Sequence, residues 1–260
     1  MMRAAKGGAP RGLFVGGLLL LASISVAACG RESAGEGGRV VSSLCDTAPG
    51  PRLVAPRLER RWLRPVGAGQ GIQVINGVVN VYGDSNTGVV MELNHRLVPT
   101  GWVGYFVTGG QTVVQHPVGI AYAPGLPTFI GSGDGPILVI DWAVFRDAGT
   151  LDGAILRTVE ETETPDVYKG SRPEYVRLGS EWYVATSDFA LSAVDDVAEL
   201  RLMDPLALSH AETTGDPGVI VHRLPVSSYI QSLHWREDIQ QLVLVQNLNS
   251  RAEGWKLTFL

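Results

Sequence analysis

Short apolar runs alternate with segments rich in Gly, Pro, Asn and Asp over most of the chain after residue 58. Runs of this kind, bounded by turn-forming residues, predict β-strands joined by tight turns. Helical periodicity is scarce, and the best helical candidate, residues 192–200, is short and of mixed polarity. The pattern therefore predicts an all-β region with little helix.

The strand pattern repeats four times, and in each unit two apolar runs lead to an Asp or an Asn. These terminal residues are Asp84, Asp134, Asp188 and Asn247. The positions that we treat as equivalent in the first runs are Ile72, Ile120, Val176 and Leu233. Their distances to the terminal residues are 12, 14, 12 and 14, and the units are spaced by 48, 56 and 57 residues.

A third strand-like run follows in every unit, and a fourth follows in the first three. The third runs are 88–94, 135–141, 197–204 and 254–260, and the fourth runs are 102–108, 154–160 and 218–226. Asn94, Asp141 and Asp204 close three of the third runs, and we interpret them as hairpin-turn residues. Residues 204–218 are expected to form a long structural hairpin.

Units of four strands repeating at this spacing are typical of β-propeller blades. The last unit stops after its third run, and residues 58–65 (LERRWLRP) precede the first unit. We expect this N-terminal segment to supply the missing strand and close the ring, which removes an open sheet edge. The prediction is a propeller of four blades, or five if one repeat has diverged, with an open β-sandwich as the alternative.

Four strings in the second half of the chain resemble a group of uncharacterised bacterial propeller-like proteins. They are HPVGIAY (116–122), GSRPEYVRLGSEWYVATSDF (170–189), AELRLMDPLALSHAETTGDPGVIV (198–221) and YIQSLHWREDIQQLVLVQN (229–247). The resemblance covers roughly residues 110–260. At the level of fold, the strand pattern is similar to calcium-dependent lactonase-like and NHL-type propellers. The resemblance implies a propeller fold and carries no established activity.

Residues 1–28 have the layout of a secretory signal. Three basic residues precede an apolar run of 16 residues, 13–28, and there is no acidic residue. The run is shorter than the ~20 residues that a transmembrane helix needs. Residues 26–29 (VAAC) resemble the lipobox of bacterial lipoproteins, so Cys29 is the expected lipidation site, with plain secretion as the alternative.

Residues 29–57 begin with a Gly- and Ser-rich stretch and predict a flexible tether between the lipid and a domain at 58–260. The expected location is the bacterial cell envelope, with the domain facing the periplasm or the exterior. Removing the three basic residues of the signal from a chain of net charge −5 leaves −8, which argues against nucleic acid as a partner. Cys45 would then be the one remaining cysteine, which excludes an intramolecular disulfide.

Propeller geometry predicts that the ends of the second strands and the starts of the first strands gather around one mouth of the central channel. The candidate ligand or metal residues there are Asp84, Asp134, Asp188, Asn247, Gln70 and Gln231, with His116 and Glu174 beside them. Carboxylate and amide oxygens suit Ca²⁺. The alternative is that the Asp and Asn side chains only cap their own turns.

Two functions remain open from the sequence. The first is a non-enzymatic, lipid-anchored propeller that binds a protein, a peptide or a glycan. The second is a calcium-dependent hydrolase or lyase acting on a lactone or a glycan, with Glu174 or His116 as general acid or base. The five histidines lack HxH or HExxH spacing and no G-x-S-x-G motif is present, so zinc-protease and α/β-hydrolase chemistry are unsupported.

Overall fold

A computed structural model describes residues 64–133, 135–162, 171–187, 197–248 and 254–260. The chain divides into two compact units, Met1–Arg57 and Leu58–Leu260, and all described residues belong to the second. The expected signal, Cys29, the tether and Cys45 therefore lie outside the described residues. In the described part of the chain, no helix has the length and apolar character needed to cross a membrane.

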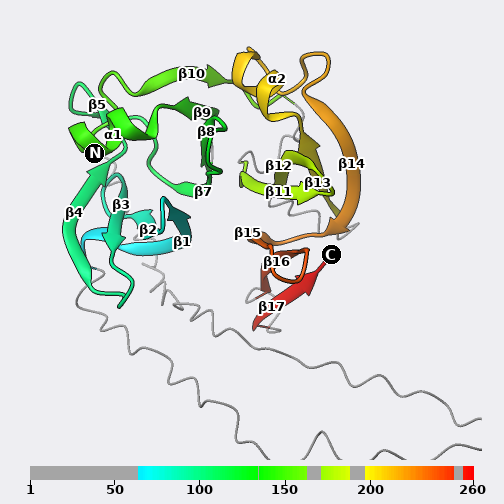
Figure 1. The fold of residues 1–260 in the computed structure, drawn as a ribbon, viewed down its shortest axis with the longest axis horizontal. Helices are drawn as coiled ribbons and strands as arrows, with labels where there is room; N and C mark the ends of the chain where they lie inside the picture. The colour runs from blue at the N-terminus through cyan, green and yellow to red at the C-terminus, as the bar shows by residue number, and fades with distance from the viewer. Residues whose placement is uncertain (1–63, 134, 163–170, 188–196, 249–253) are drawn as a thin grey trace, which may run out of the picture. The chain divides into compact units, whose positions relative to one another are not determined.

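Four antiparallel sheets follow one another along the second unit and are arranged as the blades of a propeller (Figure 1). Blade 1 consists of β1 (Ala68–Ile75), β2 (Val78–Asp84), β3 (Gly88–Leu93) and β4 (Pro99–Tyr105). Blade 2 consists of β7 (Pro117–Ala121), β8 (Thr128–Ser132), β9 (Ile137–Ile140) and β10 (Ile155–Val159). The small hairpin β5 (Val107–Thr108) and β6 (Gln111–Thr112) lies between them in the chain.

The remaining two blades complete the set. Blade 3 consists of β11 (Glu174–Leu178), β12 (Glu181–Ser187), β13 (Val197–Met203) and β14 (Ile220–Ser227). Blade 4 consists of β15 (Ile230–Arg236), β16 (Gln241–Leu248) and β17 (Gly254–Phe259). In every blade the strands pair in chain order, so the first strand is at one edge. The first strands β1, β7, β11 and β15 contact one another and surround the channel.

The prediction of a propeller is confirmed, and the described residues form four blades rather than five blades or a sandwich. Ile72, Ile120, Val176 and Leu233 all lie in first strands, and the predicted third and fourth strands are present. In blade 4 the described residues supply three strands. Residues 58–63 lie outside the described residues, so their role as a closing strand stays a prediction.

Apolar clusters join successive blades, because alternate residues of each strand point to opposite faces of its blade. Between blades 1 and 2, Tyr82 and Val90 pack against Ile120 and Ile130, together with Phe145. The cluster between blades 2 and 3 includes Phe129, Val139, Tyr175 and Val184, with Trp182 packed against it. The cluster between blades 3 and 4 includes Val176, Leu200, Leu233 and Leu244, with Tyr183 and Trp235 packed against it.

Two short helices correct the expectation of hairpin turns after the third strands. Helix α1 (Trp142–Ala148) follows β9, and helix α2 (Pro205–His210) follows β13. Asp141 and Asp204 are their N-caps, accepting hydrogen bonds from backbone N–H groups of the first turn. The interpretation of residues 204–218 as a long hairpin was therefore wrong. An Asp after a strand can cap a turn or a helix, and the residues that follow decide which.

Helix α1 forms because its apolar residues fall on one face. Trp142 and Phe145 are three positions apart, and both are buried in the cluster between blades 1 and 2. Gly149, in a left-handed conformation with φ of 70°, ends the helix. The helical candidate at 192–200 was wrong where it can be tested, because residues 197–200 belong to β13. Asn94 does act as a turn residue, since its Oδ1 accepts from the backbone N–H groups of Arg96 and Val98.

Candidate functional site at the channel mouth

The starts of the first strands bring polar side chains together at one mouth of the channel. Gln231 of β15 donates from Nε2 to Oε1 of Gln70 of β1 at 3.0 Å, although the two are 161 residues apart. Each is the extra residue of a β-bulge, since the pairing register shifts around it. A bulge turns the extra side chain out of the regular pleat. The bulges therefore present both glutamines at the mouth.

Blade 3 joins this mouth through Arg172, which lies two residues before the start of β11. Its Nε donates to the backbone oxygen of Gln231 at 3.1 Å, and its backbone N–H donates to Oγ1 of Thr186 at 3.1 Å. The Arg172 side chain is buried, although a guanidinium is normally exposed. It therefore brings a buried positive charge from blade 3 to the rim of blade 4.

Blades 1 and 2 contribute a carboxylate–imidazole pair. Oδ2 of Asp84, at the end of β2, lies 2.6 Å from Nδ1 of His116, which precedes β7. Both side chains are partly exposed, and the other carboxylate oxygen of Asp84 is buried without a hydrogen-bond partner among the described residues. The pair can exchange a proton with a bound molecule or accept a hydrogen bond from one.

Glu174 is buried among the first strands rather than exposed at the rim. Its Oε2 accepts from Nε2 of Gln73 at 2.9 Å, and its Oε1 accepts from the backbone N–H of Trp235 at 3.2 Å. Nδ1 of His234 is 3.9 Å from the same Oε1. Gln73 also donates to the backbone oxygen of Ile120 at 2.7 Å. Glu174 therefore links the first strands of blades 3, 1 and 4, and Gln73 extends this network to blade 2.

Burial makes Glu174 a neutral acid at neutral pH. Desolvation raises its pKa to about 8, and the hydrogen bonds from Trp235 and Gln73 offset only part of that rise. Burial also lowers the pKa of His234 and, together with the nearby Glu174 carboxyl, raises the pKa of Tyr82. Burial thus favours the neutral forms of Glu174, His234 and Tyr82.

The remaining predicted residues are placed less fully. Asp134 and Asp188 lie outside the described residues. Asn247, near the end of β16, donates from its backbone N–H to the oxygen of Tyr229 at 2.9 Å. Within the part of the chain that the structure describes, no three His, Cys, Asp or Glu side chains are grouped for a metal. Because two of the proposed calcium ligands are not described, the calcium site stays a prediction.

The sequence prediction missed Arg172 and Gln73, which both contribute to the channel. Arg172 stands two residues before Glu174, beside a predicted blade entry, and this position was the available signal. Gln73 is a buried glutamine between Ile72 and Val74, which is a signal of an internal hydrogen bond.

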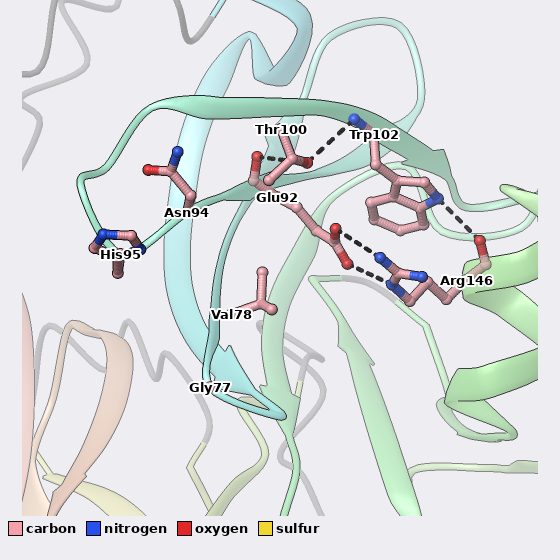
Figure 2. A pocket seen from close by; sticks show the side chains of 8 residues that line it. All are labelled: Gly77, Val78, Glu92, Asn94, His95, Thr100, Trp102 and Arg146. Carbon is pink, nitrogen blue, oxygen red and sulfur yellow. Dashed lines mark hydrogen bonds and ion pairs between the residues drawn. The ribbon is translucent and has the colours of Figure 1, made fainter.

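A second hollow lies beside blade 1, between the β1–β2 turn, the β3–β4 connection and α1 (Figure 2). Arg146 donates from Nε and Nη2 to the two carboxylate oxygens of Glu92, at 2.7 and 3.2 Å. The indole N–H of Trp102 donates to the backbone oxygen of Arg146 at 2.9 Å. Because these groups satisfy one another, this wall of the hollow is explained by the attachment of α1 to blade 1.

The chain is a β-propeller by its fold. Comparisons with models of protein families and with curated proteins find no match. The fold therefore rests on the structure alone, and the resemblance to bacterial propeller-like lipoproteins gains no support from a matching family.

Proposed function

We propose that this protein is a lipid-anchored propeller of the bacterial cell envelope that binds a protein, a peptide or a glycan at its channel mouth. One observation carries the binding function. Side chains from all four blades converge on the mouth, in the pairs Gln70–Gln231 and Asp84–His116 and through Arg172. Donors, acceptors and a cation held at the rim of a rigid ring are suited to a polar ligand.

The proposed anchor rests on the sequence of residues 1–29, with its basic start, apolar run and VAAC motif. It is tested by expressing the full chain in a bacterium fed labelled palmitate. We expect label and membrane fractionation for the parent chain and neither for Cys29→Ser. Unlabelled parent protein in the medium would contradict the anchor and leave the binding function open.

The binding function is tested with the full chain in detergent on a glycan array and a peptide library. A ligand of the mouth is expected to bind the parent at least tenfold more tightly than the Gln70→Ala/His116→Ala double variant, which corresponds to about 1.4 kcal/mol. Arg157→Ala is the matched control, because Arg157 is exposed on the outer strand β10. Equal binding by all three proteins would place the ligand elsewhere.

A second candidate is a hydrolase or lyase acting on a lactone or a glycan. The observation that favours it is the channel acid Glu174, whose pKa near 8 keeps it protonated at neutral pH, as a general acid requires. The test is turnover of a panel of lactones and glycans, with and without calcium. Turnover that disappears in Glu174→Gln would support this candidate. Absence of turnover by the parent under every condition would exclude it for those substrates.

A further inference from the structure

The hollow beside blade 1 contains polar groups that the attachment of helix α1 does not use (Figure 2). Its volume of about 420 Å³ lies in the range of small-molecule sites, roughly 300 to 1,000 Å³. Arg146 bonds to Glu92 through Nε and Nη2, which form one edge of the guanidinium, and its other N–H donors take no part in these bonds. Because the Arg146 side chain is half exposed, the remaining donors are available to a ligand.

Asn94 and His95 lie at the other end of the hollow from Arg146 (Figure 2). Oδ1 of Asn94 accepts from the backbone N–H groups of Arg96 and Val98, at 2.9 and 3.1 Å. These two bonds fix the orientation of the amide, so Nδ2 of Asn94 is the group that remains to donate to a ligand. His95 is exposed, and its ring nitrogens can donate or accept. Polar groups therefore face the hollow from both ends.

Trp102 gives the hollow an apolar wall that is held rigidly. Its indole N–H donates to the backbone oxygen of Arg146 at 2.9 Å. Phe145 contacts the indole edge-to-face with ring centroids 5.8 Å apart, and the ring of Trp142 lies 6.4 Å away. The Trp102 side chain is only partly buried and lines the hollow. A ligand would therefore meet an aromatic surface that needs no rearrangement, which lowers the cost of binding.

The charge of Arg146 is already balanced in the hollow. Both carboxylate oxygens of Glu92 lie against the guanidinium, and the Glu92 side chain is only 4% exposed. An anionic ligand at Arg146 would approach this buried carboxylate and be repelled by it. A neutral hydroxyl accepts a hydrogen bond without adding a charge, and it can also donate one. The hollow therefore suits a neutral, polyhydroxylated molecule with one apolar face, which describes a sugar ring.

We propose that this hollow is a second ligand site, which binds one neutral sugar unit of a glycan. The C–H face of the sugar packs against Trp102, and its hydroxyl oxygens accept from Arg146 and from Nδ2 of Asn94. The hollow includes the turn that follows β1, whereas Gln70 of the channel mouth lies near the start of that strand. The two sites are therefore at opposite ends of β1, and this proposal does not rest on ligand binding at the mouth.

The proposal is tested by titrating the full chain with neutral hexoses and their disaccharides, followed by calorimetry in a detergent without a sugar headgroup. Glucuronic and galacturonic acid are the charged counterparts of glucose and galactose in the panel. We expect a neutral sugar to bind and its acidic counterpart to bind more weakly, because the added carboxylate meets a charge pair that is already balanced. Tighter binding of the acidic counterpart, or binding of no sugar in the panel, would overturn the proposal.

The variant Thr100→Tyr fills the hollow. Thr100 is exposed, lines the hollow and lies on the outer strand β4, where a tyrosine is well accommodated. This variant is expected to bind the sugar at least about tenfold more weakly than the parent. Thr158→Tyr is the matched control, because Thr158 is exposed on β10, the outer strand of blade 2. The control should bind as the parent does.

His95→Ala is a second variant that keeps the test decisive if Thr100→Tyr does not fold. The exposed imidazole contributes one neutral hydrogen bond, so its loss should weaken binding about threefold and leave the midpoint of thermal unfolding unchanged. The mouth variant Gln70→Ala/His116→Ala should bind the sugar like the parent. Unchanged binding by folded Thr100→Tyr and by His95→Ala would overturn the proposal. Loss of binding in the mouth variant alone would assign the sugar to the channel mouth instead.

Discussion

The interface between blades 1 and 2 and the interface between blades 4 and 1 are built from equivalent strands but are held together differently. The first contains Phe106, Phe145 and Trp142 in ring contact, with centroids 5.3 to 5.4 Å apart, and the Glu92–Arg146 ion pair at its side. The second has the hydrogen bond between Gln70 and Gln231 near the channel and exposed apolar side chains further out. Apolar burial dominates the first, and channel hydrogen bonds dominate the second.

The described residues therefore hold blades 1 and 2 together more strongly than blades 4 and 1. Burial of large side chains contributes roughly 1.5 to 3 kcal/mol each, whereas a hydrogen bond between neutral side chains contributes roughly 0.5 to 1.5 kcal/mol. By the contacts of the described residues, the interface between blades 4 and 1 is therefore expected to open before the interface between blades 1 and 2.

The largest expected effect is at the interface between blades 1 and 2. Phe145→Ala removes a fully buried ring and should lower the free energy of unfolding by roughly 3 to 5 kcal/mol. Phe259→Ala, in the third strand of blade 4, should lower it by roughly 1 to 2 kcal/mol, because that ring is half exposed. Denaturant unfolding of both variants measures the difference. Equal losses of unfolding free energy in the two variants would show that the two interfaces do not differ in this way.

The next effect concerns Glu174, the buried acid that links blade 3 to blades 1 and 4. Below pH 4.5 Glu174 is protonated in the folded and unfolded states and does not affect stability. Above pH 4.5 the unfolded chain releases this proton while the folded protein keeps it, up to the folded pKa of about 8. Stability is therefore expected to fall over this window, by as much as roughly 5 kcal/mol, and to fall no further above it.

Glu174→Gln keeps the shape of the side chain and cannot ionise. The variant should therefore be more stable than the parent above pH 8, and the gain should disappear near pH 4.5. Comparing variant with parent at each pH removes the contribution of His234, whose lowered pKa acts in the opposite direction. A difference that does not change between pH 4.5 and pH 8 would show that Glu174 is not a neutral acid.

The fold was largely predictable because its repeats are local. The alternation of apolar residues predicted the strands, and the sequence also showed that the last unit stops after its third strand. The different orientations of Gln70, Gln231 and Glu174 were harder to predict. Each of the three lies two residues before the residue treated as equivalent in its unit, so the sequence pattern does not distinguish them. Bulges at Gln70 and Gln231 turn these side chains to the rim, whereas Glu174 pairs regularly with Ala185 and reaches into the channel. Bulges depend on the pairing of two strands and leave no signal in one of them.

A smaller effect is expected from the N-cap of helix α1. Asp141→Ala removes the acceptor for the backbone N–H groups of Ala143 and Val144 and should destabilise the protein by roughly 1 kcal/mol. Helix α1 places Trp142 and Phe145 in the interface between blades 1 and 2, so the loss of stability should appear as a lower midpoint of thermal unfolding. Asp141→Asn is the control, since asparagine caps almost as well. A similar loss in both variants would mean that charge, rather than capping, is what matters at this position.

The smallest effect lies in the hydrogen bond that joins blades 4 and 1. A double-mutant cycle with Gln70→Ala, Gln231→Ala and the double variant should give a coupling energy of roughly 0.5 to 1 kcal/mol. Arg146→Ala and Glu92→Ala give the matching cycle beside the interface between blades 1 and 2. A charged, bidentate pair with a buried carboxylate should give a larger coupling energy, roughly 1.5 to 3 kcal/mol. Equal coupling energies in the two cycles would contradict a difference between the two interfaces, because the neutral pair at the channel would then contribute as much as the ion pair beside blade 1.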